Sequence, residues 1–308
     1  MKKAQKKFTF EILIDDFFEN FNLEAGLAPI DNKKILGLLN DFEDGKWRFS
    51  HFQNFIWDNI AETALSQRER DSLVNHSLLT AAAKNLRLTD KDKIGEGSEL
   101  AEIVLYGVMK HHFSALPVVP KIFYKQNPQD NAKGADSVHI IVAENDFTVW
   151  FGEAKFYKSI EDVNLGRIVD SVANSIKTDK LKKENSIIIN VNDIDHVIDD
   201  EEMCSRIREA LSPQESIDSL KSKINIPILL LYECSVTSAQ TGMSQSYKAD
   251  IIRYHKERAT AYFKKQLSKM HGTHKYSEIC FHIILFPVPS KKNIVDKFLS
   301  NVKHYKEQ

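Results

Sequence analysis

Two apolar segments separated by a short polar turn constrain the fold of this chain more than any other feature. The segments span residues 136–143 and 147–155, and Glu144, Asn145 and Asp146 lie between them. Asparagine tolerates the positive φ that a tight turn needs, so the pattern predicts a hairpin of two antiparallel strands. We expect the chain to reverse between Glu144 and Asn145.

This reversal places Asp136 directly opposite Glu153, where the two strands begin and end. Facing residues of an antiparallel pair have Cβ atoms about 5 Å apart. Glu153 and Lys155 lie two positions apart on one strand, so their side chains share a face of the sheet. The spacing therefore predicts a pocket that holds two carboxylates and one ammonium group.

Two carboxylates this close repel each other, and burial on a sheet penalises both charges. A divalent cation removes the conflict. Mg²⁺ prefers oxygen ligands and keeps several waters, so we expect Asp136, Glu153 and the main-chain carbonyl of Ala154 to form part of its shell, with Mn²⁺ as a substitute. One bound water could act as nucleophile. Lys155 could position or deprotonate that water and stabilise charge on a phosphoryl group, which predicts phosphodiester hydrolysis.

The preceding helix, expected over residues 98–112, adds two acids to the argument. Glu99 and Glu102 flank its apolar stripe, so either could reach over the sheet as a further ligand. The spacing does not choose between them. The plain alternative is that Asp136 only begins a strand and that Glu153 forms an ordinary ion pair with Lys155. The hairpin register, the apolar strand and the acidic helix together favour a catalytic site.

The remaining pattern alternates between helices and strands, which indicates an α/β sheet protein. Residues 1–94 are expected to form a mainly helical region with helical spacing over 31–86, and residues 95–308 are expected to form the sheet domain. The further elements that we expect are strands at 8–14, 118–124, 186–191, 226–232 and 279–286, helices at 163–176 and 247–270, and a final helix.

Composition excludes several classes of protein. Hydrophobic residues at 42% and charged residues at 28% are ordinary for a folded globular chain, and the net charge of −1 gives no sign of a nucleic-acid partner. Cys204, Cys234 and Cys280 are too far apart for a paired-cysteine zinc site and odd in number for a disulfide framework. No apolar segment is long enough to cross a membrane, so we expect a cytoplasmic protein with no membrane partner.

Three segments carry a resemblance to a known family, in the expected order and at the expected spacing. They read GSELAEIVLY at 97–106, KGADSVHI at 133–140 and WFGEAKFY at 150–157. The chain resembles HamA, the effector of Hachiman anti-phage defence systems, a family with the PD-(D/E)xK nuclease fold. It departs from the motif in having Gly134 and Ala135, rather than proline, before Asp136.

The resemblance implies metal-dependent DNA cleavage by a restriction-endonuclease-like core, a mixed central sheet flanked by helices. It makes Asp136 and Glu153 metal ligands, Lys155 the catalytic lysine, and Glu102, or else Glu99, the helix acid. It also implies a partner, the superfamily 2 helicase HamB. We expect this helicase to hold the nuclease inactive until foreign or damaged DNA is engaged, and residues 1–94 could serve its docking or regulation.

Two questions stay open at the level of sequence. Lys158 and Arg167 lie just beyond the catalytic strand, so they are the expected phosphate contacts, while the basic helix at 247–270 could either face solvent or contact DNA. The alternative functions are a non-catalytic module that grips DNA or a helicase with a nuclease-like sheet, and a nuclease acting on RNA, since the same cation chemistry cleaves either backbone.

Overall fold

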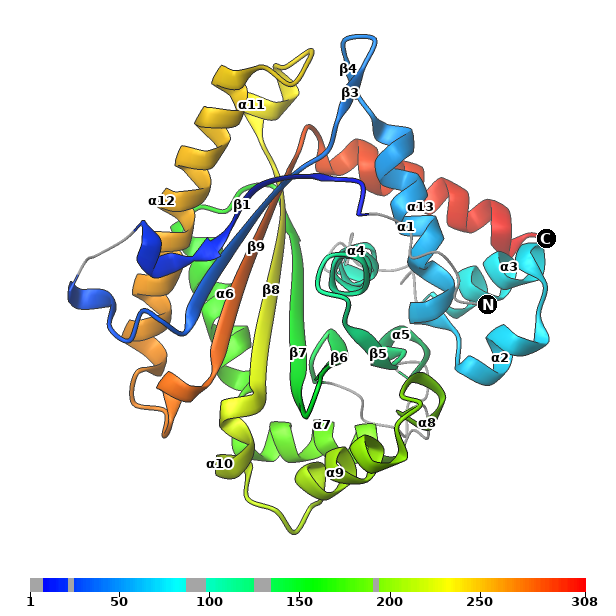
Figure 1. Ribbon diagram of the computed structural model, residues 1–308. Coiled ribbons are helices and arrows are strands. Elements are labelled where there is room, and N and C mark those ends of the chain that lie inside the picture. The colour runs from blue at the N-terminus through cyan, green and yellow to red at the C-terminus, as the bar shows by residue number, and fades with distance from the viewer. Residues whose placement is uncertain (1–7, 22–24, 87–97, 125–133, 191–193) are drawn as a thin grey trace.

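A seven-stranded mixed sheet forms the centre of the protein. The computed structural model describes residues 8–21, 25–86, 98–124, 134–190 and 194–308 (Figure 1). In spatial order the strands are β1 (Glu11–Phe17), β2 (Lys33–Leu39), β9 (Cys280–Val288), β8 (Ile224–Glu233), β7 (Asp146–Tyr157), β6 (Ser137–Ala143) and β5 (Leu116–Val119). Neighbours from β2 to β7 run parallel, and β1, β6 and β5 pair antiparallel. The predicted α/β class is confirmed.

Helices cover both faces of this sheet. The helices of the described residues are α1 (Phe49–Ala64), α2 (Gln67–Ser72), α3 (Asn75–Asn85), α4 (Ser98–His111), α5 (Lys121–Tyr124), α6 (Asp162–Ser175), α7 (Thr178–Asn190), α8 (Ile194–Val197), α9 (Glu201–Leu211), α10 (Ile217–Leu220), α11 (Ser235–Ser238), α12 (Gln245–Met270) and α13 (Lys291–Lys306). One core cluster joins the sheet to α6, α7, α9 and α12, and a second joins its other face to α1, α3, α4 and α13 (Figure 1).

Short segments complete the description. A two-stranded ribbon consists of β3 (Phe42–Glu43) and β4 (Lys46–Trp47), and 3₁₀ turns lie at Phe18–Asn20, Ala25–Leu27, Lys221–Lys223 and Tyr276–Glu278. Across the described ranges, none of the helices combines the length and the apolar character needed to cross a membrane.

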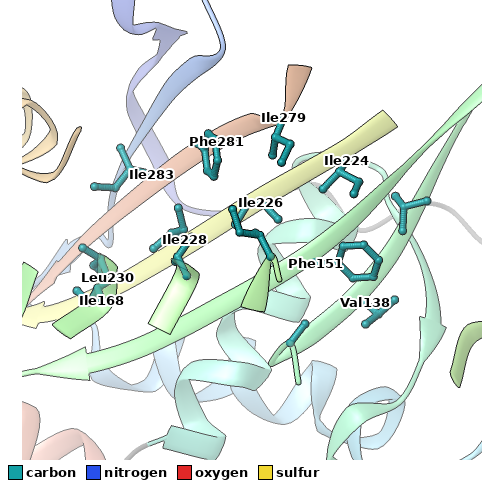
Figure 2. Packing of buried hydrophobic residues seen from close by; sticks show 14 of the residues in the cluster. Val138, Phe151, Ile168, Ile224, Ile226, Ile228, Leu230, Ile279, Phe281 and Ile283 are labelled. Atoms are coloured by element: carbon teal, nitrogen blue, oxygen red, sulfur yellow. The ribbon is translucent and has the colours of Figure 1, made fainter. Parts of the chain in front are cut away.

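The middle of the sheet is buried on both sides. β8 reads almost entirely apolar because helices cover both of its faces, as is usual for parallel strands. Figure 2 shows Ile226 and Ile228 of β8 beside Phe281 and Ile283 of β9, from the cluster that faces α6 and α12. This packed centre supports one edge of β7, the strand on which Glu153 and Lys155 lie.

Several expected elements are confirmed within a few residues. They are the helices α4, α6, α12 and α13 and the strands β6, β7, β8 and β9. The strand expected at 8–14 begins later, at Glu11. The expected boundary between residues 94 and 95 lies outside the described residues, and strands from both sides of it, β2 and β9, pair in one sheet.

Three expectations were wrong in part or in full. Residues 33–39 carry helical spacing but form β2, because this apolar segment is buried between β1 and β9. Residues 118–124 form the end of β5 and then α5, since Pro120 lacks an N–H and stops the strand. Residues 186–190 belong to α7 rather than to a strand, and residue 191 lies outside the described ranges.

Candidate active site at the end of the hairpin

The hairpin of β6 and β7 has the register predicted from its turn. Ser137 faces Gly152, and the N–H of Asp136 donates a hydrogen bond of 2.7 Å to the carbonyl of Gly152. Asp136 therefore precedes β6 by one residue but stays bonded to the neighbouring strand. This bond places its side chain beside Glu153, the next residue of β7.

Lys155 joins the two acids. Its Nζ lies 2.5 Å from Oε1 of Glu153 and 3.3 Å from Oδ2 of Asp136. The same Oδ2 accepts a hydrogen bond of 3.0 Å from the N–H of Ala154. The three side chains that the sequence placed on one face are thus brought together. The expected use of the Ala154 carbonyl as a ligand stays a prediction.

Burial and the neighbouring charges shift the pKa values of Glu153 and Lys155. Glu153 is only 5% exposed, and its pKa is raised, first by burial and then by the negative charge of Asp136, against the lowering effects of Lys155 and Ser171. For Lys155, burial alone would lower the pKa, but Asp136 and Glu153 together outweigh it and hold the pKa above its ordinary value. The ammonium form of Lys155 is therefore strongly favoured.

Helix α6 supplies a contact that the sequence did not predict. The hydroxyl of Ser171 donates a hydrogen bond of 2.5 Å to Oε1 of Glu153. Ser171 lies next to the buried stripe of α6, which contains Ile168 and Val172, so packing of that stripe turns the hydroxyl toward β7. Nothing in the local sequence distinguishes this serine from a surface serine.

Helix α12 packs against α6 in one core cluster and also forms ion pairs with it. Arg258 and Lys265 contact Asp162 at 3.3 and 3.4 Å, and Lys269 contacts Asp170 at 2.7 Å. The basic helix was expected either to face solvent or to contact DNA. Three of its charges therefore pair with acids of α6.

A buried ion pair fixes the loop that leads into Asp136. Glu184 on α7 accepts a hydrogen bond of 2.9 Å from the N–H of Ala135 and pairs with Lys121 at 2.5 Å, and both charged side chains are at most 3% exposed. A Cβ on Gly134 would lie 1.6 Å from Oε1 of Glu184. Close packing therefore favours glycine at this position, because any larger residue would displace the Glu184 carboxylate.

The two helix acids approach from the opposite face of the sheet. A Cβ on Gly152 would lie 2.7 Å from Cδ2 of Leu105, so α4 packs on the side of β7 that faces away from Glu153. Glu102 is buried and lines a small cavity that Asp136 also lines, and Glu99 is half-buried one turn earlier. In the described part of the chain, no three acidic, histidine or cysteine side chains form a group that could hold a metal. A ligand role for Glu102 or Glu99 stays a prediction.

A larger cavity of about 380 Å³ lies on the Glu153 side. Asp136 and Glu153 line it together with residues of the loop before β6 and of α6 and α7. Lys158 and Arg167 are exposed and are not part of its lining. Burial raises the pKa of Tyr157, and the charges of Lys155 and Arg167 lower it in part. The expected contacts of Lys158 and Arg167 with DNA stay predictions.

Comparison with known families gives one match. The HamA family model matches residues 15–302, nearly the whole chain. No curated protein matches the chain.

Proposed function

Since the chain belongs to the HamA family, we propose that it is a metal-dependent nuclease that hydrolyses DNA as the effector of a Hachiman-type anti-phage defence system. The observation that supports this most directly is the contact of one ammonium group, that of Lys155, with both Asp136 and Glu153. In this proposal, β6, β7 and α4 form the centre of a PD-(D/E)xK core.

Magnesium fits the donors at this position. Oδ2 of Asp136 and Oε1 of Glu153 converge on a single cationic atom, so the site already stabilises positive charge between them. Two carboxylates and the carbonyl of Ala154 would be a sufficient protein share of an Mg²⁺ shell that keeps several waters, and Mn²⁺ could substitute. The bound ion would supply a water of lowered pKa and polarise a phosphoryl oxygen.

The raised pKa of Lys155 supports one of the two roles that the sequence left open. While Asp136 and Glu153 contact it, Lys155 is held as ammonium, a form with no free electron pair to take a proton from water. Its charge instead stabilises the negative charge that grows on the phosphoryl oxygens in the transition state. Ser171 keeps Oε1 of Glu153 oriented and favours the ionised carboxylate that a cation requires.

The direct test is cleavage of a supercoiled plasmid with Mg²⁺ or with EDTA. We expect the wild-type protein to cleave only with the metal. Glu153→Ala and Lys155→Ala should each slow cleavage by about 100-fold or more, the usual effect of removing one group that stabilises the transition state.

Matched controls separate the site from general charge effects. Glu144→Ala changes an exposed acid at the opposite end of the same hairpin, and Lys182→Ala changes an exposed lysine on α7. Both should cleave like the wild type. Equal cleavage by wild type, Glu153→Ala and Lys155→Ala would end the assignment of the site. Faster cleavage of RNA than of DNA would keep the proposed nuclease chemistry and change its proposed substrate to RNA.

We also propose a HamB-like superfamily 2 helicase as the partner that restrains the nuclease until foreign or damaged DNA is engaged. The reason is physiological, since a free DNase would degrade the chromosome of its own cell. The test compares plasmid cleavage by the protein alone and with the purified helicase. Strong cleavage that the helicase does not inhibit would contradict the restraint and leave the chemistry intact.

A further inference from the structure

Apart from Ser171, the wall of the cavity of about 380 Å³ beside Asp136 and Glu153 has no role in the proposed chemistry. Gly134 forms one part of it, and polar side chains of α6 and α7 form the rest, namely Ser171, Asn174, Ser175 and Lys180. Among the described residues, the lining of the cavity thus combines two acids, Asp136 and Glu153, with one lysine, Lys180 of α7. An anionic ligand could be held by Lys180 while it approaches the carboxylate pair.

The ammonium group of Lys180 is only weakly engaged within the protein. Its contact is with Oδ2 of Asp179 at 3.8 Å, and the two side chains are 37% and 72% exposed. Ion pairs this exposed contribute little, because water competes for both charges. Lys180 can exchange this partner for a phosphate at small cost.

The wall also has the chemistry of a backbone contact rather than of a base contact. Lysine, asparagine and serine side chains supply many of the hydrogen bonds that proteins make to phosphate and sugar. No aromatic side chain is among the described residues that line the cavity, so a base would find no ring on which to stack. A ligand here would be recognised by its phosphate and sugar without regard to sequence.

We propose that this cavity holds one backbone unit of the nucleic-acid strand next to the bond that is cut, with Lys180 paired to its phosphate. The volume lies at the lower end of the range of about 300–1,000 Å³ typical of ligand pockets, which suits one such unit. The inference rests on the proposed nuclease function, and it assigns the nearest phosphate contact to α7 rather than to Lys158 or Arg167.

The test measures binding apart from cleavage. Fluorescence anisotropy of labelled single-stranded DNA and RNA oligonucleotides of the same sequence is followed in EDTA at several salt concentrations. One phosphate contact on a single strand contributes about 0.7 to the slope of log K against log salt. We expect Lys180→Gln to weaken binding and to lower the slope by about this amount. Lys182→Gln, which removes the same charge from an exposed position of the same helix, should change neither.

The outcomes separate this inference from the nuclease proposal. Equal slopes for Lys180→Gln and the wild type, or no binding of either oligonucleotide, would overturn the inference, while Mg²⁺-dependent plasmid cleavage would still stand. If the salt slope depends on Lys180 but the wild-type protein does not cleave the plasmid, the strand-binding cavity is supported and the nuclease proposal is contradicted. Of the DNA and RNA oligonucleotides, the one whose binding is weakened more by Lys180→Gln shows which backbone the cavity prefers.

Discussion

Ser171 of α6 donates a hydrogen bond of 2.5 Å to Oε1 of Glu153 on β7. This bond favours the ionised carboxylate and so lowers the pKa of Glu153 against the larger raising effect of burial. The charge state of the strand acid therefore depends on a side chain that another element supplies.

Ser171→Ala should move the acidic limb of the pH–rate profile toward higher pH. Without the hydroxyl, the pKa of Glu153 rises further above its ordinary value of 4.5, so the carboxyl stays protonated, and unable to hold a cation, up to a higher pH. The measurement is the initial rate of Mg²⁺-dependent plasmid cleavage at constant ionic strength across pH. Ser186→Ala is the control, because that hydroxyl bonds to the Lys182 carbonyl on α7. Identical limbs for Ser171→Ala and the wild type would contradict the role of Ser171.

Gly134→Ala should destabilise the protein and slow cleavage. The new Cβ would lie 1.6 Å from Oε1 of Glu184, so Glu184 must move and lose its bond to the Ala135 N–H. Loss of a hydrogen bond to a charged group costs about 1.5–3 kcal/mol, measurable by urea unfolding.

Gly166→Ala is the matched control for that change. A Cβ at Gly166 meets nothing within 4 Å, and the residue lies inside α6. Alanine has the higher helix propensity, so we expect a gain of about 0.5–1 kcal/mol. A Gly134→Ala protein as stable as the wild type would show that the loop before Asp136 can rearrange.

The Lys121–Glu184 pair should be costly to break from one side. Lys121→Met leaves the buried Glu184 carboxylate without its ammonium, and removal of one partner of a buried pair costs about 3–5 kcal/mol. Adding Glu184→Gln removes the uncompensated charge and keeps an acceptor for the Ala135 N–H. We therefore expect the double variant to be more stable than Lys121→Met in urea. If the stability losses of Lys121→Met and Glu184→Gln, each measured alone, simply add up in the double variant, the two side chains are not coupled.

Magnesium should raise the melting temperature through Asp136. A ligand that binds only the folded state stabilises it by about 2.7 kcal/mol at 100 times its dissociation constant. Asp136→Asn should abolish the difference between the Tm values with Mg²⁺ and with EDTA. Asp146→Asn, at the opposite end of the hairpin, should retain it. An equal Mg²⁺ effect in all three proteins would place the metal elsewhere.

The hairpin was predictable because its register depends on residues close in sequence. A turn at Glu144 and Asn145 and a side-chain period of two are enough to align Ser137 with Gly152. The same locality explains why the grouping of Asp136, Glu153 and Lys155 could be inferred before the fold was known.

The missed features depend on contacts between distant parts of the chain. Residues 186–190, with three adjacent isoleucines, favour a strand by propensity, but the spacing of Leu181, Glu184 and Ile188 continues a helix that packs on the core. The same packing places Glu184 against Ala135. Ser171 and Lys180 likewise join the site only through the docking of α6 and α7, for which the sequence carries no local signal.

The parallel pairing of β7 with β8, and of β9 with β2, bears on synthesis. A ribosome releases Glu153 and Lys155 well before Ile224–Glu233, the strand that supports β7, and Lys33 cannot pair with Phe281 until that distant segment has been made. For the proposed nuclease, we expect nascent chains to be inactive until β8 has been made, because β7 has no parallel neighbour before that point.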